Sequence, residues 1–262
     1  MLLGEITKKN IQCNLLCRIT KNYAGNFVSS DFYMVFMEND AFRNIVTHTA
    51  QYAHFDMKVK NWKEVYGFLV GSIDEENKEH PIVHITEAIP ITHGTHFGVE
   101  FKKEHYVLGA YLNLIIAEKD EFFVGWYHSH PGLGLFLSQT DVINQLGYQI
   151  VNDKAIALVF DNTKIILKEP PLDIFQLDNP AFGASSAYHS IDYYIGGIKK
   201  DDEFNSIKEF YYQVEADVIA NKTTPIEQEV KKRVTQWRKA TKIELPESQL
   251  FKKGSRKKRR AK

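Results

Sequence analysis

The feature that most constrains the fold is the stretch at residues 121–151, which reads EFFVGWYHSHPGLGLFLSQTDVINQLGYQIV. Its first ten residues are mostly apolar or aromatic and include His128 and His130 at their end, which is typical of a buried strand that delivers two imidazoles. A proline and glycines shape a short loop, and Ser138 is then a favoured N-cap for a helix. The stretch therefore predicts a layered domain in which a strand end meets a helix start.

The rest of residues 31–180 alternates between strand-like and helix-like segments in the same way. Apolar or alternating runs predict strands at residues 32–37, 64–74, 81–91, 154–161 and 164–169, the last two joined by a turn at residues 161–163. Apolar residues at helical spacing predict helices at residues 38–55, with Asn39 or Asp40 as N-cap, and at residues 105–120. This alternation predicts an α/β (α+β) domain of roughly 150 residues.

The chain divides into four parts on these patterns. We expect an N-terminal extension at residues 1–30, the α/β domain at residues 31–180, a linker and helical region at residues 181–251, and a disordered basic tail at residues 252–262. Within the third part, residues 179–198 fit no regular pattern, whereas residues 205–220 and 224–242 predict two helices.

The tail is the most strongly charged segment. The formal net charge is zero, but residues 252–262 carry eight of the 33 basic residues and no acidic residue, which leaves 25 basic against 33 acidic residues in the rest of the chain. Such a tail can be a solvated end, can bind RNA, DNA or another polyanion by releasing counterions, or can dock on an acidic partner or on the acidic body. It contains no aromatic residue, so base stacking is not predicted.

Composition narrows the class and the compartment. With 44% hydrophobic and 25% charged residues, the chain is typical of a globular protein with a packed core. Cys13 and Cys17 are its two cysteines; they make no disulfide framework, and no second pair completes a four-thiolate metal site. No apolar run reaches about 18 residues and no signal peptide is apparent, so we expect a cytoplasmic protein that does not enter a membrane.

The opening stretch also predicts a metal site. Side chains at positions i and i+2 of a strand point to the same side, so His128 and His130 can reach one ion. Asp141 lies in the first turn of the following helix, close to the strand end. Two imidazoles, a carboxylate and an open fourth position are typical of catalytic zinc, so we expect one Zn²⁺ per chain. Two such histidines also occur by chance, but the added serine and aspartate make chance a poor explanation.

The strings GWYHSHPG, LSQTDV and EVYGFLVG resemble the JAMM (MPN+) metalloprotease family over roughly residues 32–180, most of all the proteasome-lid deubiquitinase and signalosome deneddylase branch. The resemblance implies an MPN/JAB1-type mixed sheet flanked by helices, with zinc held by His128, His130 and Asp141. It also implies that Glu64 acts as general base and then as acid, and that Ser138 donates a hydrogen bond to the oxyanion. Leu135 and Phe136 stand where eukaryotic members of this branch have Cys-Trp, and neither is a ligand in this scheme.

The resemblance further implies a substrate. Related enzymes cleave isopeptide bonds made by ubiquitin or ubiquitin-like proteins, and a flap pairs with the modifier C-terminus as an added strand. Residues 90–105 would be that flap, with a substrate-binding strand at Phe97, Gly98, Val99, Glu100 and Phe101. The alternatives are a non-catalytic MPN scaffold, or a related hydrolase of another amide such as a sulfur-carrier adduct. The C-terminal helices could join an MPN-type or proteasome-like partner.

Overall fold

The computed structural model describes residues 34–74, 81–95, 98, 103–198 and 202–225, with a few helical residues between 228 and 239. It contains one eight-stranded mixed sheet with the order β7-β6-β5-β4-β2-β3-β1-β8. In chain order the strands are β1 (Met34–Met37), β2 (Val65–Asp74), β3 (Ile82–His93), β4 (Phe122–Ser129), β5 (Ile156–Phe160), β6 (Leu172–Leu177), β7 (Tyr188–Ser190) and β8 (Asp192–Ile195). The helices are α2 (Asn39–Ala53), α3 (Lys103–Ile116), α4 (Gln139–Gln149), α5 (Thr163–Leu167) and α6 (Glu203–Ile219), with short 3-10 turns at Val59–Asn61, Ala117–Lys119 and Pro180–Ser185.

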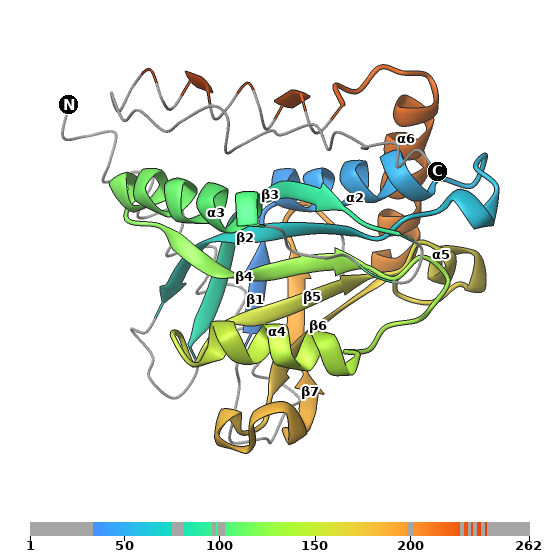
Figure 1. Ribbon diagram of the computed structural model, residues 1–262. Coiled ribbons are helices and arrows are strands. Elements are labelled where there is room, and N and C mark those ends of the chain that lie inside the picture. The colour runs from blue at the N-terminus through green and yellow to red at the C-terminus, as the bar shows by residue number, and fades with distance from the viewer. Residues whose placement is uncertain are drawn as a thin grey trace, which may run out of the picture.

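Both faces of the sheet are covered, which makes three layers (Figure 1). Alternate residues of β2 and β4 point to opposite faces. Leu69 and Tyr127 belong to the core formed with α2 and α6, whereas Phe68 and Trp126 belong to the core formed with α3 and α4. The first seven residues of β2 are all buried, as expected for a strand that helices cover on both sides.

The topology places β4 near the middle of the sheet (Figure 1). It runs antiparallel to β2 and parallel to β5, and α4 makes the crossover between β4 and β5. The C-terminal end of β4 therefore lies beside the N-terminal end of β2, with the start of α4 directly after it. The α/β (α+β) class and the mixed sheet flanked by helices are confirmed.

One predicted strand is wrong. Residues 164–169 lie largely in the five-residue helix α5 and its end, and β6 is the strand that pairs antiparallel with β5. The carboxylate of Asp161 accepts hydrogen bonds from the backbone N–H and the hydroxyl of Thr163, which favours a turn of helix at this point. Of the three apolar residues that suggested a strand, only Ile165 is buried, whereas Ile166 and Leu167 are exposed.

Smaller differences concern caps and the region after residue 180. The N-cap of α2 is Glu38, not Asn39 or Asp40, and its side chain makes no capping bond. The unassigned residues 179–198 form a 3-10 turn and the strands β7 and β8. Because β8 pairs with β1 and α6 packs against α2, the sheet and its covering layer extend past residue 180 (Figure 1).

Some predictions fall outside the described residues: the N-terminal extension with its cysteines, most of the flap strand, and the basic tail. The helix predicted at residues 205–220 is confirmed as α6, while residues 224–242 are described only in part. Among the helices described, none has the length and apolar character needed to span a bilayer.

Candidate metal centre

The end of β4 brings two imidazoles into the interior. His128 pairs with Tyr66 of β2 on one side and with Val159 of β5 on the other, so its backbone is held within the sheet. His130 lies just beyond the strand, and its N–H donates to the carbonyl of Phe160 at 2.8 Å. Both histidines are 3% exposed. The predicted alternation is confirmed, because the two side chains converge on one point.

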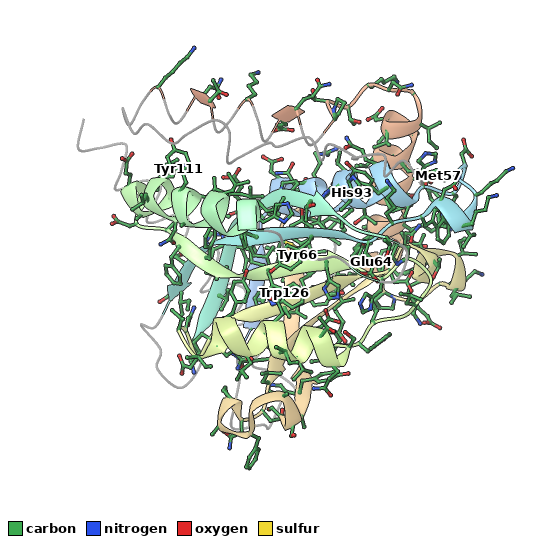
Figure 2. All side chains as sticks on the ribbon, in the orientation of Figure 1. Met57, Glu64, Tyr66, His93, Tyr111 and Trp126 are labelled. Carbon is green, nitrogen blue, oxygen red and sulfur yellow. The ribbon has the colours of Figure 1, made fainter. Side chains whose placement is uncertain are left out.

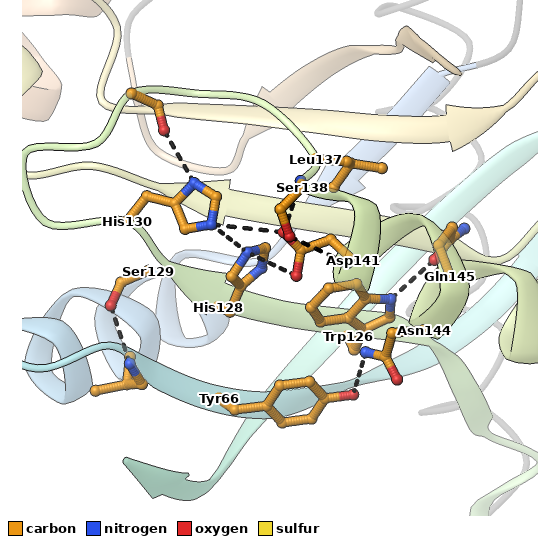
Figure 3. Close-up of polar contacts among 12 residues, drawn as sticks. Tyr66, Trp126, His128, Ser129, His130, Leu137, Ser138, Asp141, Asn144 and Gln145 are labelled. Carbon is orange, nitrogen blue, oxygen red and sulfur yellow. Dashed lines mark hydrogen bonds and ion pairs between the residues drawn. The ribbon is translucent and has the colours of Figure 1, made fainter. Parts of the chain in front are cut away.

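The start of α4 supplies the third group through a capping box. The N–H of Asp141 donates to Ser138 Oγ at 3.3 Å, and the N–H of Ser138 donates to Asp141 Oδ2 at 2.8 Å. This reciprocal pair turns the Asp141 carboxylate back toward the end of β4 (Figure 3). A local sequence signal, serine followed three positions later by an acid, therefore aims the carboxylate.

The three groups form a compact cluster. His128 Nε2 and His130 Nε2 are 2.8 Å apart, and they lie 3.4 Å from Asp141 Oδ1 and 3.6 Å from Asp141 Oδ2 respectively (Figure 3). His130 Nδ1 lies 3.2 Å from the carbonyl oxygen of Gly134, so this nitrogen carries a hydrogen, and in the neutral imidazole Nε2 then keeps its lone pair. Two imidazole nitrogens and a carboxylate face one point and could hold a metal ion, and these donor types fit a zinc ion.

The side chains of the cluster shift one another's pKa values. Burial would raise the pKa of Asp141, but hydrogen bonds to His128 and His130 and the charge of His128 hold it well below its usual range. Burial lowers the pKa of His128 against the opposing effect of Asp141. Burial also acts to lower the pKa of His130, but the carboxylates of Asp141 and Glu64 outweigh it and raise that pKa.

Glu64 lies immediately before β2 and lines the same groove as the cluster. Its backbone is tied to the start of the predicted flap: its N–H donates to the Thr95 carbonyl at 2.8 Å, and its carbonyl accepts from the N–H of Gly94 at 2.9 Å. Burial raises the pKa of Glu64 to about 7, with His130 lowering it and Asp141 raising it further. A carboxyl group with such a pKa can take up and release a proton near neutral pH.

The cluster opens into a groove of about 1790 Å³ between α3 and α4. Its lining includes Glu64, His128, His130, Ser138 and Asp141, so all five residues predicted to bind the metal or to act in catalysis face one space. Thr95 and Gly98 also line it, and they are joined by a backbone hydrogen bond from Thr95 N–H to Gly98 O at 2.9 Å. Phe97, Val99, Glu100 and Phe101, the other predicted flap residues, lie outside the described residues.

Sequence reasoning missed a stack of rings behind the cluster. Trp126 stacks on His128, with ring centroids 4.7 Å apart (Figure 3). It also stacks on Tyr66, with ring centroids 5.2 Å apart (Figures 2 and 3). The indole N–H of Trp126 donates to Gln145 Oε1 at 2.8 Å. The period-two signal that paired His128 with His130 also places Trp126 on that face, so it could have been found.

Phe136, at the position that departs from the family pattern, packs on the cluster. Its ring centroid is 4.9 Å from that of His130, and the side chain is 39% exposed at the rim of the groove. It adds apolar surface beside the imidazole and leaves the ligand set complete.

Comparison with known proteins agrees with the fold. Residues 30–154 match the family described as JAB1/Mov34/MPN/PAD-1 ubiquitin protease. The chain is 31% identical over 119 residues to the 26S proteasome regulatory subunit RPN11 of Eremothecium gossypii, covering 45% of this chain and 37% of that protein. It is 41% identical over 59 residues to the ubiquitin carboxyl-terminal hydrolase RPN11 of Saccharomyces cerevisiae, covering 22% and 19% of the two. These matches thus span well under half of each relative.

Proposed function

Residues 30–154 of this chain belong to the JAB1/Mov34/MPN/PAD-1 family, and from this membership we propose that the protein is a zinc-dependent isopeptidase. It would hydrolyse the bond between the C-terminus of a ubiquitin-like modifier and a lysine. The observation that carries the proposal is the cluster of His128, His130 and Asp141, whose ligand atoms lie within 4.8 Å of one another in the groove that Glu64 also lines.

The metal would be held by His128 Nε2, His130 Nε2 and the carboxylate of Asp141. A zinc ion bound there would make water nucleophilic near neutral pH and would polarise the carbonyl of the scissile bond. The buried setting suits this chemistry, because electrostatic interactions are stronger where water is excluded.

Glu64 would move the proton. Its carboxylate would accept a proton from the attacking water while the water oxygen bonds to the carbonyl carbon. It would then give this proton to the lysine nitrogen as the carbon–nitrogen bond breaks, which yields a carboxyl terminus and a free amine. The pKa of Glu64, raised to about 7 by burial, suits both halves of this transfer.

Ser138 would stabilise the charge on the former carbonyl oxygen. In the capping box Ser138 Oγ acts as acceptor, so the capping bond does not use the hydroxyl hydrogen. Donating that hydrogen to a developing oxyanion typically contributes about 10²–10³ in rate.

The groove supports an extended, largely apolar substrate segment. Its lining includes Phe68, Phe123 and Trp126, and a Cβ added at Gly147 of α4, which also lines it, would meet nothing within 4 Å. The C-terminal segment of a modifier could lie there while pairing as an added strand with the flap. A narrow passage beside the metal would then favour a Gly-Gly terminus.

Two alternatives remain as outcomes of the test. A non-catalytic MPN scaffold is disfavoured by the complete set of ligands and acid–base groups facing one groove. A hydrolase of another amide, such as a sulfur-carrier adduct, would use the same metal centre and would bind a different substrate in the groove. We also propose a cytoplasmic site of action, an MPN-type or proteasome-like partner for the C-terminal helices, and a polyanion or acidic partner for residues 252–262.

The deciding experiment is cleavage of a ubiquitin-type modifier linked through its C-terminal glycine to a lysine, with and without a zinc chelator. Glu64→Gln is expected to lose about 10²–10⁴ in rate while keeping its zinc. Glu118→Gln, which changes an exposed carboxylate on the Ala117–Lys119 turn, is the matched control and should behave as the parent. Bound zinc without cleavage of any modifier would favour another amide, whereas absence of zinc would favour the scaffold.

A further inference from the structure

Asp161 is a buried carboxylate beside the metal centre that the proposed mechanism does not use. It directly follows β5, is 1% exposed, and is not a member of the ligand cluster. A buried carboxylate is costly unless hydrogen bonds replace its hydration. Asp161 has four such bonds, so its position in the fold is well defined.

Two segments of the chain supply the four hydrogen-bond donors to the Asp161 carboxylate. Oδ1 accepts from the N–H of Gly132 at 2.9 Å and Oδ2 from the N–H of Gly134 at 2.9 Å, both in the loop between β4 and α4. Oδ1 also accepts from the N–H and the hydroxyl of Thr163 at 2.9 and 2.7 Å. Each glycine therefore has its own carboxylate oxygen, while Thr163 anchors the carboxylate to α5.

The loop that Asp161 holds has a conformation that needs such support. Gly132 and Gly134 have φ angles of 78° and 100°, in the region that side-chain-bearing residues rarely adopt. Glycine is also the residue with the most freedom to lose on folding, so this loop is costly to order. The two N–H bonds to one rigid carboxylate fix both glycines at once.

The held loop in turn orients a metal ligand. The carbonyl of Gly134, on the residue whose N–H Asp161 accepts, receives the hydrogen bond from His130 Nδ1 at 3.2 Å. That bond sets the ring orientation and the tautomer that leaves Nε2 free to bind. A path of two hydrogen bonds therefore runs from Asp161 through Gly134 to His130.

We propose that Asp161 is a positioning residue for the metal centre, which fixes His130 as a ligand by clamping both glycines of the loop at residues 131–134. This inference rests on the metal centre of the proposed function. The proposed role explains why this position holds an aspartate. An asparagine has only one acceptor oxygen, so its NH₂ group would face the N–H of one glycine and could not accept a hydrogen bond from it.

The test uses the full chain, stripped of metal and titrated with Co²⁺, whose visible absorption reports the ligands and their geometry. The parent is expected to bind one Co²⁺ per chain. Asp161→Asn should bind it about 10–100-fold more weakly and with changed absorption bands. Thr163→Val is the matched control, because it removes one bond to Asp161 and leaves both glycine bonds; it should keep the parent affinity and spectrum.

Each outcome separates the two proposals. If the parent binds Co²⁺ and a folded Asp161→Asn binds it with the same affinity and spectrum, the positioning role is overturned and the metal centre stands. If the parent binds no Co²⁺, the metal centre itself is overturned. If Asp161→Asn does not fold, Asp161→Glu replaces it: it keeps two oxygens but displaces them by a methylene, so the same weakening is expected, and parent-like binding would overturn the role.

Discussion

Histidines are buried on both faces of the sheet, but their surroundings differ. On the face covered by α2 and α6, His48 is 1% exposed and its Nδ1 lies 2.9 Å from the hydroxyl of Tyr127. On the face covered by α3 and α4, the Nε2 atoms of His128 and His130 face each other and Asp141. Burial alone therefore does not distinguish a structural imidazole from a ligand; the neighbouring donor atoms do.

The two faces also differ in how completely they are filled. A Cβ added at Gly67 would come within 2.2 Å of the Tyr127 ring and 2.6 Å of the Ile89 carbonyl oxygen, whereas a Cβ added at Gly147 would meet nothing within 4 Å. Gly67 lies in β2, against a closed core, and Gly147 lines the groove. One face is packed like a protein interior, and the other keeps space that a substrate segment could occupy.

The largest expected effect is the difference in zinc binding between substitutions of His128 and of His48. His128→Asn should abolish stoichiometric zinc binding and reduce cleavage by at least about 10³-fold, since a ligand is lost. His48→Asn should keep zinc and activity and should lower the free energy of unfolding by about 1–2 kcal/mol, because one buried hydrogen bond is lost. Metal analysis, cleavage rates and urea unfolding of both variants provide the check. Equal zinc content in the two would remove the distinction between the faces.

The next effect compares the two glycines. Gly67→Ala should lower the free energy of unfolding by about 1–3 kcal/mol, because its methyl group would overlap the backbone and the Tyr127 ring. Gly147→Ala should raise that free energy by roughly 0.5–1 kcal/mol, because alanine is favoured over glycine inside a helix and the added methyl group meets open space. Urea denaturation measures both; a stabilised Gly67→Ala would contradict the closed packing of that face.

A third effect concerns pH. Burial, with a smaller contribution from the charge of His93, lowers the pKa of His48 from 6.5 to about 3. Between these values the unfolded chain binds a proton that the folded chain excludes, so His48 should make stability fall as the pH drops from above 6.5 toward 3. Through His48 alone, the free energy of unfolding should be about 2 kcal/mol lower at pH 5 than at pH 7.5. The parent should thus lose more stability than His48→Asn over that interval in paired urea titrations, and equal losses would argue against a buried neutral imidazole.

The smallest effect tests the groove. Gly147→Leu should raise KM for a modifier conjugate by about tenfold, corresponding to roughly 1.4 kcal/mol of lost binding, because the side chain narrows the space beside the substrate segment. Zinc content should be unchanged, and Gly147→Ala serves as the smaller control. If the leucine variant cleaves with the parent KM, the substrate lies elsewhere on the enzyme.

Much of the candidate site could be predicted because its parts are local. The pairing of His128 with His130 follows from the two-residue period of a strand, and the direction of Asp141 follows from a capping box with Ser138. Glu64 was harder to predict from the sequence alone. It joins the site only because β2 pairs antiparallel with β4, which lies about sixty residues further along the chain. Alone it is one carboxylate at a strand start, and the family resemblance supplied its role.

The sequence by itself determined the layered class, the order of most strands and helices, and the donor set at the end of β4. These follow from periodicity and capping, whose physical basis lies within a few residues. Only the tertiary structure decided that residues 163–167 turn as a helix beside Asp161, that β8 joins β1, and that a groove stays open between α3 and α4. Each of these features depends on contacts between segments far apart in the chain. A short stretch of sequence does not contain both partners of those contacts, so it cannot predict them.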